Sequence, residues 1–165
     1  MLTQEKLKEL FRYDPETGNL IWRVRNSNRI KIGAVAGTLT NYGYVSISIE
    51  GERHLAHRLI WLLHNGRWPS GEIDHANLIK TDNRIENLRD ATHGENARNR
   101  PAQSNSSSKI KGVCWDSRHS KWLVQVSSHG KKRHIGRFNT LDEAEAAARL
   151  RREELHGEFV NHGGK

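Results

Sequence analysis

Residues 72–99 constrain the fold of this chain more than any other stretch. Residues 72–75 and 87–91 have the composition of short strands, and the polar segment between them has no helical period. Thr92 and Glu95 then have the spacing of a capping box, in which an N-cap hydroxyl and a glutamate three residues later satisfy the first backbone N–H groups of a helix. The stretch therefore predicts two strands joined by a long loop, followed by a helix.

Side chains suited to chemistry gather in the same stretch. Asp74 and His75 are adjacent, and Asn83, Asn87 and Asn96 follow at widening intervals. Aspartate and asparagine are also common in turns, so shaping the loop is the simpler explanation of any one of them. Their occurrence together, in this order, favours a functional site.

The order DH, DNR, ENLR and ENARN resembles the motif of the HNH nuclease family, most closely that of phage and intron-encoded homing endonucleases. The resemblance implies a ββα-metal module in which His75 is the general base that activates water and Asn87 orients its imidazole. It also implies that Asp74 and Asn96 hold one divalent cation. Many family members carry a histidine where this chain has Asn96.

Phosphodiester hydrolysis agrees with these residue types. Histidine supplies a base with a near-neutral pKa, and a cation offsets the negative charge that develops on the phosphate. The carboxylate of Asp74 and the amide carbonyl of Asn96 are hard oxygen ligands. They favour Mg(II) or Mn(II) over a tightly held Zn(II).

The charge balance indicates an acidic polymer as partner. The chain has a formal net charge of +8 and a pI of about 9.9, which favours nucleic acid ahead of a membrane surface. Residues 109–138 hold eight basic residues and one acid. A solvated basic face is the plain alternative, but this density favours contacts with phosphate.

A second module is expected after a linker. Residues 101–108 read PAQSNSSS, a small polar segment typical of a linker. Three strand-like segments come next, and Thr140 with Glu143 forms another capping box, which predicts a helix ending near Gly157. The pattern predicts a three-stranded antiparallel sheet packed on one helix.

Markers in this module, KGV, W, GRF, TLDEA and HGEFVN, resemble the Apetala-two/ethylene-responsive-factor DNA-binding domain along nearly its full length. The resemblance implies a sheet that lies in the major groove of DNA. The residues that it places against DNA are Lys111, Gly112, Cys114, Gln125, Ser127, Lys132 and His134. Lys131, Arg133, Arg118 and Lys121 are expected to contact phosphate, where charge matters more than position. Plant members favour arginine at several of these positions and tryptophan in place of His134, so their base preference does not transfer. Trp122 is expected in the core, and Trp115 is open between the core and base stacking.

These patterns predict an α+β chain with an HNH endonuclease domain in residues 1–100, a linker in 101–108 and an Apetala-two-like DNA-binding domain in 109–163. Cys114 is the one cysteine, which excludes an internal disulfide and a Cys-rich zinc site. The chain has no apolar run of about 18 residues, and its N-terminal residues lack the apolar core of a signal peptide. We therefore expect a cytoplasmic location, in the host cell if the chain is phage-encoded, and no membrane or obligate protein partner.

The expected function is that of a metal-dependent endonuclease that hydrolyses phosphodiester bonds in duplex DNA, with the second module as its tether. A site-preferring homing enzyme that nicks DNA as a monomer is the expected form. Two alternatives stay open. One is a non-catalytic, sequence-specific DNA-binding regulator, against which the intact Asp74, His75, Asn87 and Asn96 argue. The other is a structural nucleic-acid-binding protein without sequence preference.

Overall fold

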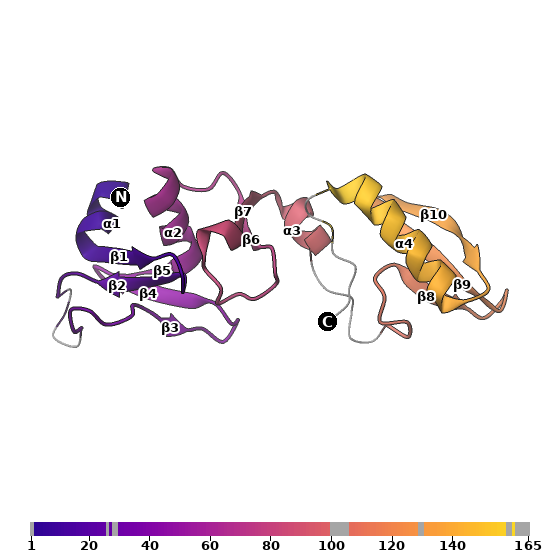
Figure 1. The fold of residues 1–165 in the computed structure, drawn as a ribbon, viewed down its shortest axis with the longest axis horizontal. Helices are drawn as coiled ribbons and strands as arrows, with labels where there is room; N and C mark the ends of the chain where they lie inside the picture. The colour runs from indigo at the N-terminus through magenta and orange to yellow at the C-terminus, as the bar shows by residue number, and fades with distance from the viewer. Residues whose placement is uncertain are drawn as a thin grey trace. The chain divides into compact units, whose positions relative to one another are not determined.

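The computed structural model describes residues 2–25, 27, 30–99, 106–128, 131–157 and 160. The chain divides into two compact units, Met1–Thr92 and His93–Lys165, whose helices and strands are labelled in Figure 1. Most of the predicted linker, the turn at residues 129–130 and parts of the HGEFVN segment lie outside the described residues. Both units combine strands with helices, so the predicted α+β class is confirmed.

The first unit is built from small antiparallel sheets and helices. Its elements in chain order are α1 (Gln4–Leu10), β1 (Phe11–Asp14), β2 (Asn19–Trp22), β3 (Thr38–Leu39), β4 (Val45–Ile49), β5 (Glu52–Leu55), α2 (Ala56–Asn65), β6 (Glu72–His75), the 3-10 turn η1 (Ile85–Asn87) and β7 (Leu88–Ala91). β1 pairs with β2, β4 lies between β3 and β5, and β6 pairs with β7.

Apolar side chains from these elements form one core. Phe11, Ile47, Leu59 and Ile60 are each at most 2% exposed, and the rings of Phe11 and Trp22 lie 4.4 Å apart between centroids. Removal of such side chains from water is the main favourable term in folding. The core holds α2 against β4 and β5 and so determines where the polar residues of α2 lie.

Leu7, Leu10 and Phe11 have helical spacing, which predicts a short helix from Leu2 to Phe11 and no strand at Phe11. The structure ends α1 at Leu10, and Phe11 begins a strand opposite Trp22. The backbone N–H of Phe11 still bonds to the carbonyl of Leu7. Pairing with β2 therefore overrides the local helical pattern only from the cap residue onward.

The second unit contains α3 (His93–Asn99), β8 (Val113–Asp116), β9 (Lys121–Ser128), β10 (Lys131–Phe138) and α4 (Leu141–His156). β9 lies between β8 and β10 in an antiparallel three-stranded sheet, and α4 packs on this sheet. The core between them contains Val113, Val124, Ala144 and Ala148, each at most 3% exposed. The small alanine side chains let the helix approach the sheet closely.

The ends of α4 agree with the sequence-based prediction. The hydroxyl of Thr140 accepts from the backbone N–H of Glu143, and the Glu143 carboxylate accepts from the backbone N–H of Thr140. Gly157 is the C-cap residue, with a φ of 51°. In the part of the chain that the structure describes, no helix is both long enough and apolar enough to cross a membrane.

Candidate functional site

His75, at the end of β6, lies in the interior of the first unit and is 5% exposed. Its Nε2 lies 3.1 Å from Oδ1 of Asn83, in the loop between β6 and β7. An amide oxygen only accepts hydrogen bonds, so Nε2 carries the ring proton and the lone pair of the neutral ring is on Nδ1. This bond therefore selects one tautomer of the imidazole.

Two aromatic rings pack against the His75 imidazole. The ring centroid of His57, in α2, lies 5.1 Å from that of His75 with the planes at 89°, and the centroid of Tyr44 lies 6.0 Å away. Tyr44 and His57 also pack edge to face, with centroids 5.2 Å apart. We refer to Tyr44, His57 and His75 as the ring cluster. Its packing restricts rotation of the His75 ring.

Burial keeps both imidazoles of the ring cluster neutral near pH 7. Burial lowers the pKa of His57 to about 3, and the nearby His75 acts in the same direction. Burial also lowers the pKa of His75, an effect opposed by the hydrogen bond with Asn83 and by the charges of Asp74 and Asp82. A neutral imidazole can accept a proton, as general base catalysis requires.

Asp74 precedes His75 on β6 and points to the opposite face of the strand. Its carboxylate is 3% exposed and faces Arg89, its register partner on β7. Nε of Arg89 donates to Oδ2 of Asp74 at 3.1 Å, and Nη2 donates to the same oxygen. The ion pair compensates a buried negative charge. A buried carboxylate is also a hard oxygen donor that suits Mg(II) or Mn(II).

Asn87 holds the loop that carries Asn83. Its Oδ1 accepts from the backbone N–H of Asn77 at 2.9 Å, and its Nδ2 donates to the carbonyl of Asp82 at 2.7 Å. The predicted task of Asn87 was to orient His75. In the structure Asn83 supplies the amide at Nε2 of His75, while Asn87 stabilises the loop. The DNR motif contained Asn83, but its sequence position alone did not show this contact.

Two residues of the β1–β2 hairpin support the same loop. The hydroxyl of Tyr13 accepts from the backbone N–H of Ile85 at 2.9 Å and donates to the carbonyl of Asn83 at 3.5 Å. A Cβ atom at Gly18 would lie 2.5 Å from the backbone nitrogen of Arg84. The hairpin and the loop are therefore in close contact, which the sequence did not predict.

Asn96 lies in α3, which belongs to the second unit, and its predicted pairing with Asp74 stays a prediction. Within the described ranges, no group of three or more His, Cys, Asp or Glu side chains is placed to hold a metal ion. A cation at Asp74 would need amide, water or phosphate oxygens as further ligands, which is typical of Mg(II).

Comparison with known proteins agrees with this geometry. A family model described as HNH endonuclease matches residues 54–98. Protein 3.8 of Escherichia phage T7 is 34% identical over 105 residues, which cover 63% of this chain and 86% of the phage protein. The chain belongs to the family of this phage protein and carries an HNH endonuclease domain. No solved structure matches the chain significantly.

The HNH domain includes α2, β6, η1 and β7 and most of α3. It therefore contains His57, His75 and Asn83, whereas Tyr13 and Tyr44 come from the preceding part of the first unit. The family indicates a nuclease with a DNA substrate. The apolar helix that carries His57 favours a packing role for this residue, and the structure buries it against Tyr44 and His75. Its contact with His75 could not be predicted from the sequence.

Outside the HNH domain, the sheet of the second unit presents a face turned away from α4. Val124 and Val126 of β9 are buried on the side of the sheet that faces α4. Gln125 and Ser127 alternate with them along the strand and therefore lie on the open face. The antiparallel pairing of β9 with β8 and β10 places side chains of those two strands beside them on the same face. The predicted DNA-binding residues on the open face are Cys114, Gln125, Ser127, Lys132 and His134.

The other predicted DNA-binding residues have different surroundings. Lys131 and Arg133 are exposed but lie in register with the helix-side residues of β9. Nζ of Lys111 donates to the carbonyl of Arg98 at 2.6 Å. Gly112 has a φ of 76°, and a Cβ atom there would lie 2.3 Å from the carbonyl oxygen of the neighbouring strand β9. The DNA contacts of these residues stay predictions.

The two tryptophans of this sheet differ in exposure. Trp122 packs against the core between the sheet and α4, as predicted. Trp115 is 46% exposed, with its ring centroid 5.1 Å from that of Trp122. Trp115 therefore combines a packing contact with an accessible face.

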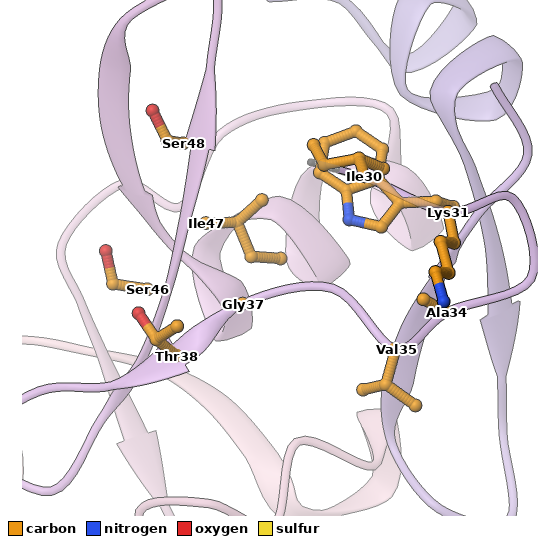
Figure 2. A pocket seen from close by; sticks show the side chains of 10 residues that line it. Ile30, Lys31, Ala34, Val35, Gly37, Thr38, Ser46, Ile47 and Ser48 are labelled. Atoms are coloured by element: carbon orange, nitrogen blue, oxygen red, sulfur yellow. The ribbon is translucent and has the colours of Figure 1, made fainter. Parts of the chain in front are cut away.

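A pocket of about 420 Å³ lies in the first unit, between the segment after β2 and strand β4. Figure 2 shows its lining, in which Val35 and Ala34 lie on one side and Ser46 and Ser48 of β4 lie on the other. The lining includes none of the predicted site residues. The candidate site is therefore the ring cluster with Asn83 and Asp74, and not this pocket.

Proposed function

We propose that this chain is a metal-dependent DNA endonuclease in which His75 is the general base. The neutral, buried imidazole with its proton held at Nε2 by Asn83 is the observation that carries the proposal. Nδ1 takes a proton from the water that attacks phosphorus. In the imidazolium formed in this step, Nε2 still donates to Oδ1 of Asn83. The ring therefore keeps its orientation during the reaction.

Asp74 and Asn96 are the proposed ligands of one divalent cation, Mg(II) or Mn(II). When bound, such an ion supplies positive charge that stabilises the developing charge on the phosphate and the leaving oxygen. Arg89 compensates part of the negative charge of Asp74 and holds its carboxylate on the β6–β7 hairpin. Arg89 is therefore a positioning residue for the proposed ligand.

For residues 109–163 we propose a DNA-binding domain of the Apetala-two type. Its support is the open sheet face that carries Gln125, Lys132 and His134, together with the basic composition of residues 109–138. A sheet of this size fits the major groove. Joined to residues 1–100 through the linker at 101–108, it would raise the effective concentration of DNA at the nuclease site.

The proposed biological form is a site-preferring homing enzyme that nicks DNA in the host cytoplasm. The phage origin of Protein 3.8 supports a phage-encoded enzyme. A single general base attacks one phosphodiester at a time, so nicking by a monomer is the expected product.

A plasmid-nicking assay with Mg(II) and Mn(II) tests the nuclease function. The parent chain should convert supercoiled plasmid to the nicked form, and His75→Ala should abolish this conversion. His64→Ala is the matched control, because His64 is exposed on α2. Equal cutting by the parent and His75→Ala, or none by the parent, would contradict the proposal. DNA binding without any cutting would favour the regulator instead.

A further inference from the structure

A lysine is held at the border of the ring cluster. Nζ of Lys80, in the β6–β7 loop, donates to the carbonyl of Tyr42 at 2.9 Å. The same ammonium lies 4.7 Å from the centroid of the Tyr44 ring, a favourable cation–π arrangement. Neither contact neutralises the positive charge of Lys80. Since Tyr44 packs against His75, this charge lies beside the proposed site of hydrolysis.

The turn that receives Lys80 is well ordered by its own hydrogen bonds. Between β3 and β4, the backbone N–H of Thr40 donates to the carbonyl of Tyr44 at 2.8 Å, and that of Gly43 donates to the carbonyl of Thr40 at 2.9 Å. The hydroxyl of Thr40 accepts from the backbone N–H of Tyr44 at 3.1 Å. This turn leaves Tyr42 80% exposed next to Lys80.

The β6–β7 loop exposes apolar side chains directly before Lys80. Leu78 is 37% exposed and Ile79 is 55% exposed. Leu78 also has a φ of 65°, a conformation that is unfavourable for leucine. Its backbone N–H donates to the carbonyl of His75 at 2.9 Å, which ties it to the site. Strained residues of this kind concentrate at functional sites.

Acidic groups in this loop do not cancel the charge of Lys80. Nε and Nη2 of Arg84 donate to the two carboxylate oxygens of Asp82 at 2.8 Å and 2.7 Å. Asn77 donates to the same carboxylate at 2.7 Å. The negative charge of Asp82 is therefore engaged within the loop.

We propose that Tyr42, Leu78, Ile79 and Lys80 form a strand-contact surface for the DNA that flanks the scissile phosphate. Lys80 binds a neighbouring phosphate, and the tyrosine ring and branched side chains lie against sugars and base edges. Such a mixture of a cation with exposed apolar side chains suits nucleic acid, since phosphate contacts position a protein and apolar side chains contact or wedge between bases. The proposal rests on the proposed nuclease function.

The phosphate contact is tested by binding of duplex DNA to the full chain in EDTA, where no cutting occurs. Lys80→Gln should weaken binding several-fold and reduce the slope of log affinity against log salt by about one. Lys6→Gln is the matched control, because Lys6 also has an exposed side chain, on α1, and should leave both quantities unchanged. Equal effects in both variants, or none in Lys80→Gln, would overturn the contact.

The apolar contact is tested by Leu78→Asn, since asparagine tolerates a positive φ. This variant should unfold at the same temperature as the parent chain or a higher one, while nicking and DNA affinity fall roughly fivefold, as expected for loss of one apolar contact. Ile32→Asn is the control, because Ile32 is 68% exposed elsewhere in the first unit. Retained nicking and affinity in Leu78→Asn would contradict the surface.

These measurements separate the surface from the nuclease function. If the parent chain binds DNA but never nicks it, and Lys80→Gln and Leu78→Asn still weaken binding, the nuclease function fails and the surface stands. If the parent chain nicks DNA and neither variant differs from its control, the surface fails and the nuclease function stands.

Discussion

Nε2 of His75 and Oδ1 of Asn83 lie 3.1 Å apart and join the end of β6 to the β6–β7 loop. The orientation of the proposed base therefore depends on the position of this loop. Asn87 holds the loop from η1, and Tyr13 and Gly18 hold it from the β1–β2 hairpin. Substitutions away from the reacting atoms should consequently change the rate of nicking.

Replacement of Asn83 by leucine should lower kcat for nicking by about 100-fold, because the ring loses the acceptor that selects its tautomer and orientation. KM should change little, since Asn83 is 3% exposed and is not part of the proposed strand-contact surface. Steady-state nicking kinetics measure both. Asn65→Leu, at an exposed position of α2, is the control. An unchanged kcat in Asn83→Leu would refute the orienting role.

Tyr13→Phe should reduce the free energy of unfolding by about 1 kcal/mol, because the backbone N–H of Ile85 loses its acceptor. Urea denaturation measures this change. Tyr42→Phe removes the same hydroxyl at an exposed position and should leave stability unchanged. If Tyr13→Phe and the parent chain unfold at the same urea concentration, the hydrogen bond from Ile85 to Tyr13 contributes nothing to stability.

Gly18→Ala and Gly33→Ala separate backbone strain from collision with the loop. Both glycines have positive φ, 71° and 83°, so both variants should lose about 1 kcal/mol of stability. Only the Gly18 variant places a Cβ against the loop, 2.5 Å from the backbone nitrogen of Arg84, whereas Gly33 has nothing within 4 Å. Gly18→Ala should therefore be the less stable protein and should also nick more slowly. Identical losses in the two variants would argue against the contact.

The free energy of unfolding should fall as the pH is lowered below about 6.5. The pKa of His57 is about 3 in the folded chain and near its ordinary value of 6.5 in the unfolded chain. Between these values the unfolded chain binds a proton that the folded chain does not, so acid favours unfolding. One pKa unit corresponds to about 1.4 kcal/mol, which makes the contribution of the order of several kcal/mol.

Urea denaturation of His57→Phe between pH 5 and 8 checks this assignment. The variant keeps a ring in the ring cluster but cannot be protonated, so its stability should vary less with pH than that of the parent chain. The lowered pKa of His75 contributes in the same direction in both proteins and does not obscure the difference. If the free energy of unfolding depends on pH in the same way in both proteins, His57 is not buried in the neutral form.

The strands and helices around the site were predictable because each has a local cause. The strand-like composition of β6 and β7, the strand-like segments of the second unit and the capping box of α4 all depend on residues close in sequence. Asp74 and His75 were recognisable from their place in a short motif. The strand β1 was missed, since its helical spacing is local and its pairing with β2 is not.

By itself, then, the sequence determined the α+β class, the hairpin that carries Asp74 and His75, and the basic sheet with its capped helix. Only the tertiary structure decided that Asn83 bonds to His75, that His57 and Tyr44 pack on its ring and that Lys80 lies over Tyr44. The physical reason is the range of the interactions involved. Hydrogen-bonded turns and caps join near neighbours in the chain, whereas ring packing in a core joins whichever side chains the fold brings together.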